Sequence, residues 1–261
     1  MQIKLIFAIK LFCLNNTIFL ITPPFTQLNT PYPATAYLKG FLNTKNIAST
    51  QADLGIEVIL ELFSKKGLTN LFSSIQLKDT YSANAKRMLV LKNDYINSID
   101  AVIFFLQGKN TVLAPLICKR NFLPEAERFA QTDDLAWAFG SMGVQDKAKH
   151  LATLYLEDLS DLIKECVDEH FGFSRYAEKL GRSANSFDEL YAELQKPNTF
   201  IDNILLTILK NKMESIQPKM VCISVPFPGN LYASLKCGQW IRQHYPDTKV
   251  CMGGGFANTE L

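Results

Sequence analysis

Residues 218–261 read PKMVCISVPFPGNLYASLKCGQWIRQHYPDTKVCMGGGFANTEL, and this stretch decides the fold. The apolar run at 220–225 predicts a strand, and the prolines and glycine of 226–230 predict a turn after it. A helix is expected over 231–244, and then a second strand over 248–252 that runs into three glycines. A strand–helix–strand unit of about 30 residues is long enough for one right-handed parallel crossover. The stretch therefore predicts a parallel α/β sheet.

The start of the chain repeats this pattern. Residues 18–22 (IFLIT) predict a strand that must end at Pro23 and Pro24, because proline has no N–H to donate to a ladder. A helix from Pro33 to residue 44, a strand over 47–52 and a helix over 54–65 are expected to follow. Two such halves indicate a doubly wound sheet of the flavodoxin-like or Rossmann-like type.

The middle of the chain differs from both ends, because it has helical periodicity and almost no convincing strand. The clearest helix is expected over 146–170, where leucines recur every three or four residues. Residues 101–106 (AVIFFL) fit either a helix or a strand by composition. The sequence therefore predicts a large helical insertion at 84–217 in the sheet domain.

The predicted domain order follows from these patterns. Residues 1–17 are a leader or a start-site extension, 18–83 form the first half of the sheet domain, and 218–261 form its second half. No helix is expected after the glycine triplet to cover the final strand, whereas a parallel strand needs cover on both faces. The second half is therefore expected to be incomplete at this end of the sequence.

Composition excludes several classes of protein. The net charge of +2 is spread along the 261 residues, so no basic face for nucleic acid is expected. The six cysteines form no C-x-x-C, so no zinc or iron–sulfur ligand set is expected, and reduced thiols indicate a cytoplasmic protein. Polar residues interrupt the apolar N-terminus before it reaches the roughly 18 residues of a membrane span, so no membrane segment is expected.

Open parallel sheets bind ligands at the carboxyl ends of their strands, and the loops at these ends supply the candidate site. Prolines shape the first loop, Asp53 follows the second strand, and glycines without Cβ atoms allow backbone to approach a ligand. Asp53 fits a helix N-cap equally well, Asn230 is expected to cap the following helix, and the triplet could be a flexible turn. No catalytic or metal-binding residue is predicted. The predicted binding residues are Pro23, Pro24, Asp53, Ser224, Asn230, Gly253, Gly254 and Gly255.

Several stretches resemble the N-terminal half of bacterial radical SAM proteins that carry a cobalamin-binding-type domain. The similarity spans nearly all of the chain after residue 17, and its last two pieces are the most specific. The stretches are IFLITPPFTQLNTPYP (18–33), FFLQG (104–108), FLPE (122–125), LATLYLEDL (151–159), FGFSRY (171–176), SVPFPGN (224–230) and GGGFANTEL (253–261).

The resemblance implies a cobalamin-binding-like accessory region that holds cobalamin or substrate at the strand ends. It implies that the [4Fe-4S] cluster and S-adenosyl-L-methionine belong to a radical SAM barrel after Leu261, which would be the partner of this region. The chain alone would then be inactive, whereas the whole protein would be an enzyme. Two motifs are absent: D-x-H-x-x-G, whose histidine ligates cobalt in many such domains, and C-x-x-x-C-x-x-C, which holds the cluster.

Two alternatives remain open. A nucleotide- or sugar-nucleotide-binding transferase domain would bind a diphosphate with the glycine triplet, without any further sequence. A non-catalytic interaction module would dock a partner on its helices, and it predicts an exposed apolar patch and no deep pocket.

Overall fold

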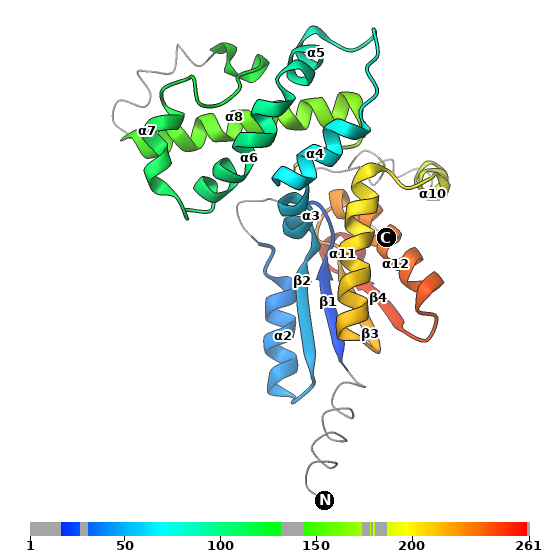
Figure 1. The fold of residues 1–261 in the computed structure, drawn as a ribbon. Coiled ribbons are helices and arrows are strands. Elements are labelled where there is room, and N and C mark those ends of the chain that lie inside the picture. The colour runs from blue at the N-terminus through cyan, green and yellow to red at the C-terminus, as the bar shows by residue number, and fades with distance from the viewer. Residues whose placement is uncertain are drawn as a thin grey trace, which may run out of the picture. The chain divides into compact units, whose positions relative to one another are not determined.

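The computed structural model describes residues 17–26, 31–131, 143–173, 178, 180 and 187–259. The chain forms two compact units (Figure 1). The sheet unit comprises Met1–Val58 and Gly172–Leu261, and the helical unit comprises Ile59–Phe171. The predicted helical insertion between the second and third strands is confirmed, although these bounds differ from the predicted 84–217.

The sheet has four parallel strands in the order β2-β1-β3-β4. The strands are β1 (Ile18–Thr22), β2 (Ser49–Asp53), β3 (Met220–Ser224) and β4 (Lys249–Gly253). From β1 the chain adds β2 on one side, then returns to add β3 on the other side. The predicted doubly wound α/β fold is thus confirmed, and its topological switch point lies between β1 and β3.

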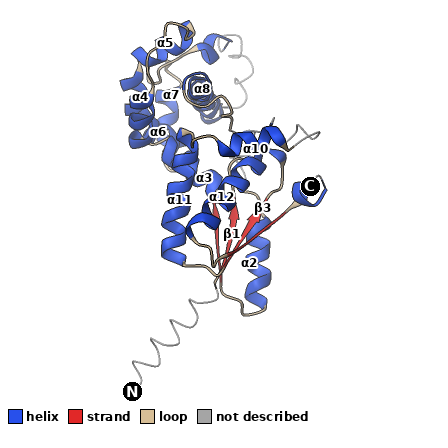
Figure 2. Cartoon of the chain, turned by 90° about the vertical axis from the view of Figure 1, so that its right-hand side faces the viewer, coloured by secondary structure: helices blue, strands red, loops and turns tan. Residues whose placement is uncertain are grey.

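The two faces of the sheet are covered unequally. Side chains alternate between the faces, so Phe19, Ile21, Val221 and Ile223 share one face, and all four are buried. Helix α11 (Phe200–Ile216) lies on one side of the sheet and helix α2 (Ala34–Thr44) on the other (Figure 2). The main strand contacts of α2 are with β1 and β2. On the face that α2 covers, cover is therefore thinnest over β3 and β4.

The helices of the sheet unit begin and end where local chemistry dictates. Thr199 and Asp202 form a capping box at the start of α11, and Gln217 ends that helix in a left-handed conformation. Helix α10 (Asp188–Gln195) precedes it, and the 3-10 turn η4 (Pro228–Asn230) leads into α12 (Leu231–His244). The expectation that no helix follows the glycine triplet is wrong, because α13 (Gly255–Thr259) begins there. Even so, Lys249, Cys251 and Met252 of β4 are exposed.

Helix α3 (Leu54–Leu62) starts in the sheet unit and leads to the helical unit. The helical unit contains α4 (Lys65–Ser74), α5 (Ala83–Val90), α6 (Lys92–Leu106), η1 (Thr111–Leu113), α7 (Ala114–Ile117), η2 (Glu127–Gln131) and α8 (Gly143–Cys166). The ambiguous stretch 101–106 is helical, because it forms the end of α6. At its core the rings of Tyr95 and Tyr155 stack with centroids 5.2 Å apart, and both residues are fully buried.

Within the described ranges, no helix has both the length and the apolar character that crossing a bilayer requires. The predicted leader, except for Thr17, lies outside the described residues.

Candidate functional site

One row of residues crosses the whole sheet at its carboxyl edge. Thr22 of β1 is paired with Asp53 of β2, and Ser224 of β3 with Gly253 of β4. Since Ile21 is paired with Ile223, Thr22 and Ser224 are also neighbours. Because residues at one register position of parallel strands point the same way, all four lie on the same face of the sheet. The structure therefore brings Asp53, Ser224 and Gly253 of the predicted site into one row.

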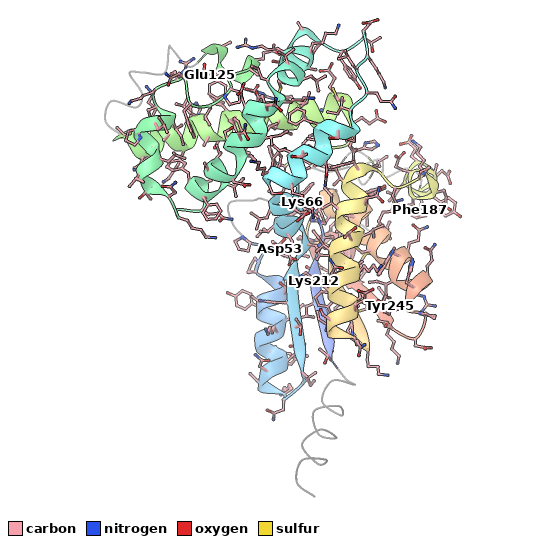
Figure 3. The ribbon with its side chains drawn as sticks, in the orientation of Figure 1. Asp53, Lys66, Glu125, Phe187, Lys212 and Tyr245 are labelled. Carbon is pink, nitrogen blue, oxygen red and sulfur yellow. The ribbon has the colours of Figure 1, made fainter. Side chains whose placement is uncertain are left out.

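Asp53 has one carboxylate oxygen in use and one without a partner. Asp53 lies at the end of β2 (Figure 3). Its Oδ1 accepts a hydrogen bond from the backbone N–H of Ile56 at 3.0 Å, so Asp53 does cap α3, which is one of its two predicted roles. Its Oδ2 is buried and has no partner among the described residues. Burial raises the pKa of the Asp53 carboxyl, and the nearby charge of Glu57 adds to this effect, although two backbone N–H groups oppose it.

Asn230 connects the two loops at the switch point. It occupies the N-cap position of α12, but the prediction that its side chain caps the helix is wrong, because that side chain makes no cap bond. Instead, its Nδ2 donates a buried hydrogen bond of 2.7 Å to the carbonyl oxygen of Pro23. A carbonyl only accepts, so this bond fixes the orientation of the amide and leaves Oδ1 as an acceptor. Within the described part of the chain, that buried Oδ1 has no partner.

Thr22 completes the row, and it is not among the binding residues predicted from the sequence. Its side chain is 0% exposed, and its Oγ1 has no partner in the described structure. Its position at the end of a strand, next to Pro23, could have identified it as a site residue. Threonine is common in strands, however, so its residue type did not distinguish it.

The three glycines have different surroundings. A Cβ on Gly254 would lie 2.6 Å from the carbonyl oxygen of Val225, and its φ is +124°. Gly254 is therefore required for the close contact of β4 with the loop after β3, where the Val225 N–H also donates to the Gly253 oxygen at 2.7 Å. A Cβ on Gly253 would meet no atom within 4 Å, so Gly253 is the open position of the triplet. A Cβ on Gly255 would lie 3.4 Å from the carbonyl oxygen of Pro226.

The loop after β1 packs on the start of α3. A Cβ on Gly55 would lie 3.2 Å from Asp53 Oδ1 and 3.5 Å from the Cα of Pro24. Pro23 contributes its carbonyl to Asn230, and Pro24 stands against the turn that holds Asp53. Both prolines thus shape the loop that lies between the two polar side chains.

The oxygens without partners define what this edge can bind. Asp53 Oδ2 and Asn230 Oδ1 accept hydrogen bonds, and Thr22 Oγ1 can accept or donate. Leaving such groups buried and unsatisfied costs about 1–3 kcal/mol each. A ligand with hydroxyl, amide or ammonium donors would satisfy them, whereas a diphosphate would face a carboxylate and a carbonyl oxygen. The edge therefore suits a ligand rich in donors.

Among the described residues, no group of three or more His, Cys, Asp and Glu side chains could hold a metal ion. All three histidines are described: His150 and His170 belong to the helical unit, and His244 ends α12, where its Nδ1 lies 2.9 Å from the oxygen of Trp240.

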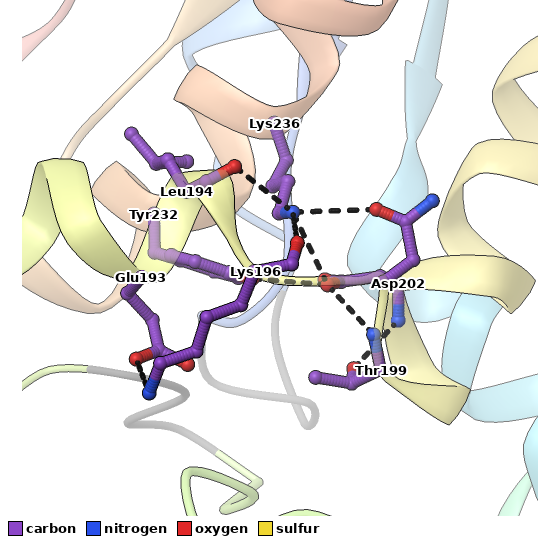
Figure 4. Close-up of polar contacts among 8 residues, drawn as sticks. Glu193, Leu194, Lys196, Thr199, Asp202, Tyr232 and Lys236 are labelled. Carbon is purple, nitrogen blue, oxygen red and sulfur yellow. Dashed lines mark hydrogen bonds and ion pairs between the residues drawn. The ribbon is translucent and has the colours of Figure 1, made fainter.

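A second buried polar cluster, which the sequence analysis also missed, lies between α11 and α12 (Figure 4). Lys236 is 3% exposed and Asp202 is 0% exposed, and their Nζ and Oδ2 atoms are 3.8 Å apart. Asp202 Oδ2 also accepts from the Tyr232 hydroxyl at 2.9 Å and from the Thr199 N–H at 3.1 Å. Lys236 Nζ donates to Asn198 Oδ1 at 3.2 Å and to two backbone oxygens at 3.4 Å. This cluster joins the start of α11 to α12.

The helical unit has a surface cavity of about 610 Å³ beside the start of α5. Arg120 lines it, but this guanidinium is bound to Glu125 through its Nε at 2.7 Å and its Nη2 at 2.9 Å. Exposed apolar side chains of this unit, such as Val90, Phe104 and Val112, lie on three different elements.

Comparisons with protein-family models, with curated proteins and with solved structures found no match for this chain.

Proposed function

We propose that the sheet unit binds a small molecule rich in hydrogen-bond donors at the carboxyl edge of the sheet. One observation carries this proposal: three buried oxygens, on Thr22, Asp53 and Asn230, have no partner among the described residues. They lie at the ends of β1 and β2 and at the start of α12. In protein structures generally, most buried polar groups have a hydrogen-bond partner, which is a protein group or an ordered water. The β1/β3 switch point is also where ligands bind in open α/β sheets.

The ligand class that we propose is cobalamin, or the substrate of a radical SAM enzyme of which this chain is the N-terminal accessory region. Cobalamin carries amide side chains around its ring, and their N–H groups match the free oxygens of Asp53 and Asn230. Bound cobalamin would supply methyl-transfer or radical chemistry through its cobalt. The chain would hold the molecule by its periphery, because His244, the histidine of the sheet unit, ends α12 and does not lie at this edge.

The first test is an anaerobic titration of the purified chain with hydroxocobalamin, followed by visible spectroscopy. We expect saturable binding near one equivalent and a spectrum without nitrogen ligation from the protein. Asp53→Ala and Asn230→Ala should each weaken binding about tenfold, since each removes one hydrogen bond worth roughly 1 kcal/mol or more. Lys210→Ala removes an exposed side chain of α11 that pairs with Glu214, so it is the matched control and should bind normally.

Failure to bind would reject cobalamin and leave the donor-rich substrate as the ligand to test. Reconstitution with iron and sulfide gives a separate test of the accessory role, for which we expect no cluster on this chain. A stoichiometric [4Fe-4S] cluster would contradict it.

A further inference from the structure

Two cysteines on adjacent strands occupy the same register position. Cys222 of β3 is the Cα partner of Cys251 of β4, so their side chains point to the same face of the sheet. Neighbouring strands lie about 4.8 Å apart, which falls inside the Cα separation of about 4.4–6.8 Å that a disulfide spans. The two sulfur atoms can therefore be joined without unpairing the strands.

Both thiols lie where the sheet is least covered. Across this row, the side chain of Leu20 in β1 is buried, that of Cys222 is half-buried and that of Cys251 is exposed. Cys237, in contrast, is fully buried, and Cys118 and Cys166 belong to the helical unit. Within the described part of the chain, Cys251 is thus the thiol that a dissolved reagent reaches most easily.

The two thiols also differ in their environments. Burial raises the pKa of Cys222 to about 12, and its hydrogen bond to Cys251 adds to this shift. The Cys222 sulfur is therefore mostly protonated near neutral pH, and it starts an exchange reaction only slowly. The strand pairing keeps Cys222 beside Cys251, in place for a second step.

We propose that Cys222 and Cys251 form a reversible dithiol–disulfide site that a low-molecular-weight disulfide oxidises. The Cys251 thiolate attacks one sulfur of the reagent disulfide and forms a mixed disulfide, and the other half of the reagent leaves as a thiolate. Cys222 then loses its proton to solvent and its sulfur attacks Cys251 Sγ, which releases the second half of the reagent. Two protein thiols are oxidised and one reagent disulfide is reduced to two thiols.

The strand pairing makes this disulfide easy to reduce. The Cβ atoms of a direct pair in a parallel sheet are separated by about the strand spacing, roughly 4.8 Å, whereas relaxed disulfides prefer about 3.8 Å. Strained disulfides are the labile ones. Cys222 lies two residues before Ser224, and Cys251 two residues before Gly253, so the bond would fix β4 next to the edge row.

The test treats the purified 261-residue chain with oxidised glutathione at neutral pH, then maps peptides after alkylation of the remaining thiols. We expect one intramolecular disulfide, between Cys222 and Cys251, that reduced glutathione reverses. Cys222→Ser should stop at glutathione bound to Cys251, because the resolving sulfur is gone. Cys251→Ser should react at Cys222 at least about tenfold more slowly than wild type does at Cys251.

Cys118→Ser and Cys13→Ser are the controls, and both should form the same disulfide as wild type. The proposal is overturned if wild type retains glutathione on Cys251 without forming the bond, or if Cys251 pairs with another cysteine. The wild-type peptide map decides this point even if a variant fails to fold. The result does not depend on the ligand of the edge row.

Discussion

The sheet unit contains two clusters of buried polar side chains, and they differ in how completely their groups are paired. Around Asp202 and Lys236, a carboxylate and an ammonium meet each other, a tyrosine hydroxyl and several backbone groups. At the carboxyl edge, Thr22, Asp53 and Asn230 each keep a buried oxygen that has no partner in the part of the chain that the structure describes. One unit can thus satisfy buried charge fully, and the second cluster is where we propose that a ligand supplies the missing partners.

The largest effect is expected from breaking the paired cluster. Asp202→Ala would leave the Lys236 ammonium buried without its carboxylate, so the free energy of unfolding should fall by about 3–5 kcal/mol. Chemical denaturation measures this. The control is Lys212→Ala, which removes a partly exposed ion pair with Glu57 (2.8 Å) and should cost about 1 kcal/mol or less. An Asp202→Ala cost equal to the control would mean that the cluster adds nothing to stability.

A buried carboxylate of the helical unit gives an intermediate effect that depends on pH. Asp158 is 0% exposed, and its oxygens accept from the N–H groups of Ala126 (3.1 Å) and Arg128 (3.0 Å). Burial raises the pKa of its carboxyl from 3.8 to about 6. The folded state therefore binds a proton more tightly than the unfolded state, and this contribution to stability is greatest below about pH 4 and is lost as pH rises to about 6.

The loss over this range should be at most about 3 kcal/mol, from about 1.4 kcal/mol per pKa unit. Asp158→Asn cannot titrate, so the difference in unfolding free energy between variant and wild type should change between pH 4 and pH 6. Urea denaturation at several pH values measures that difference. A difference that is constant with pH would contradict the raised pKa.

The smallest expected effect on stability comes from removing single buried hydroxyl groups, one in the edge row and one outside it. Thr22→Val replaces an unpartnered buried hydroxyl by a methyl of similar size, so the unliganded chain should gain about 1 kcal/mol. Ser49→Ala removes a similar unpartnered hydroxyl at the opposite end of β2 and should also stabilise. Only Thr22→Val should weaken ligand binding, as titration of both variants will measure. Equal binding by both would remove Thr22 from the site.

Sequence patterns predicted the sheet well because β1 and β3 are short apolar runs that proline follows closely, and β4 runs into glycines. The strand at 18–22 has the predicted bounds, and the strands at 49–53 and 249–253 are displaced by one or two residues from the prediction. Helical periodicity found α11 but assigned it to the insertion, whereas it belongs to the sheet unit. An apolar stripe indicates that one face of a helix is buried, but it does not indicate which element that face packs against.

The candidate site was predicted only in part, for a related reason. Position at a strand end selected Asp53 and Asn230, but the bond from Asn230 to Pro23 depends on the tertiary fold. Thr22 and the Asp202–Lys236 cluster were not predicted. Their residue types are common, and only their burial makes their polar groups notable, which the sequence does not show. The glycine triplet was found, yet Gly254 serves contact with Val225.

The hydrogen bond between Asn230 and Pro23 joins residues that are 207 positions apart. Such a contact cannot form early in folding by chance, because closing a long flexible loop has a large entropic cost. The helical unit is one continuous segment, and it has its own core around Tyr95 and Tyr155. We therefore expect it to fold first and to shorten the effective loop between β1 and β3, so that the order of folding decides when the candidate site is assembled.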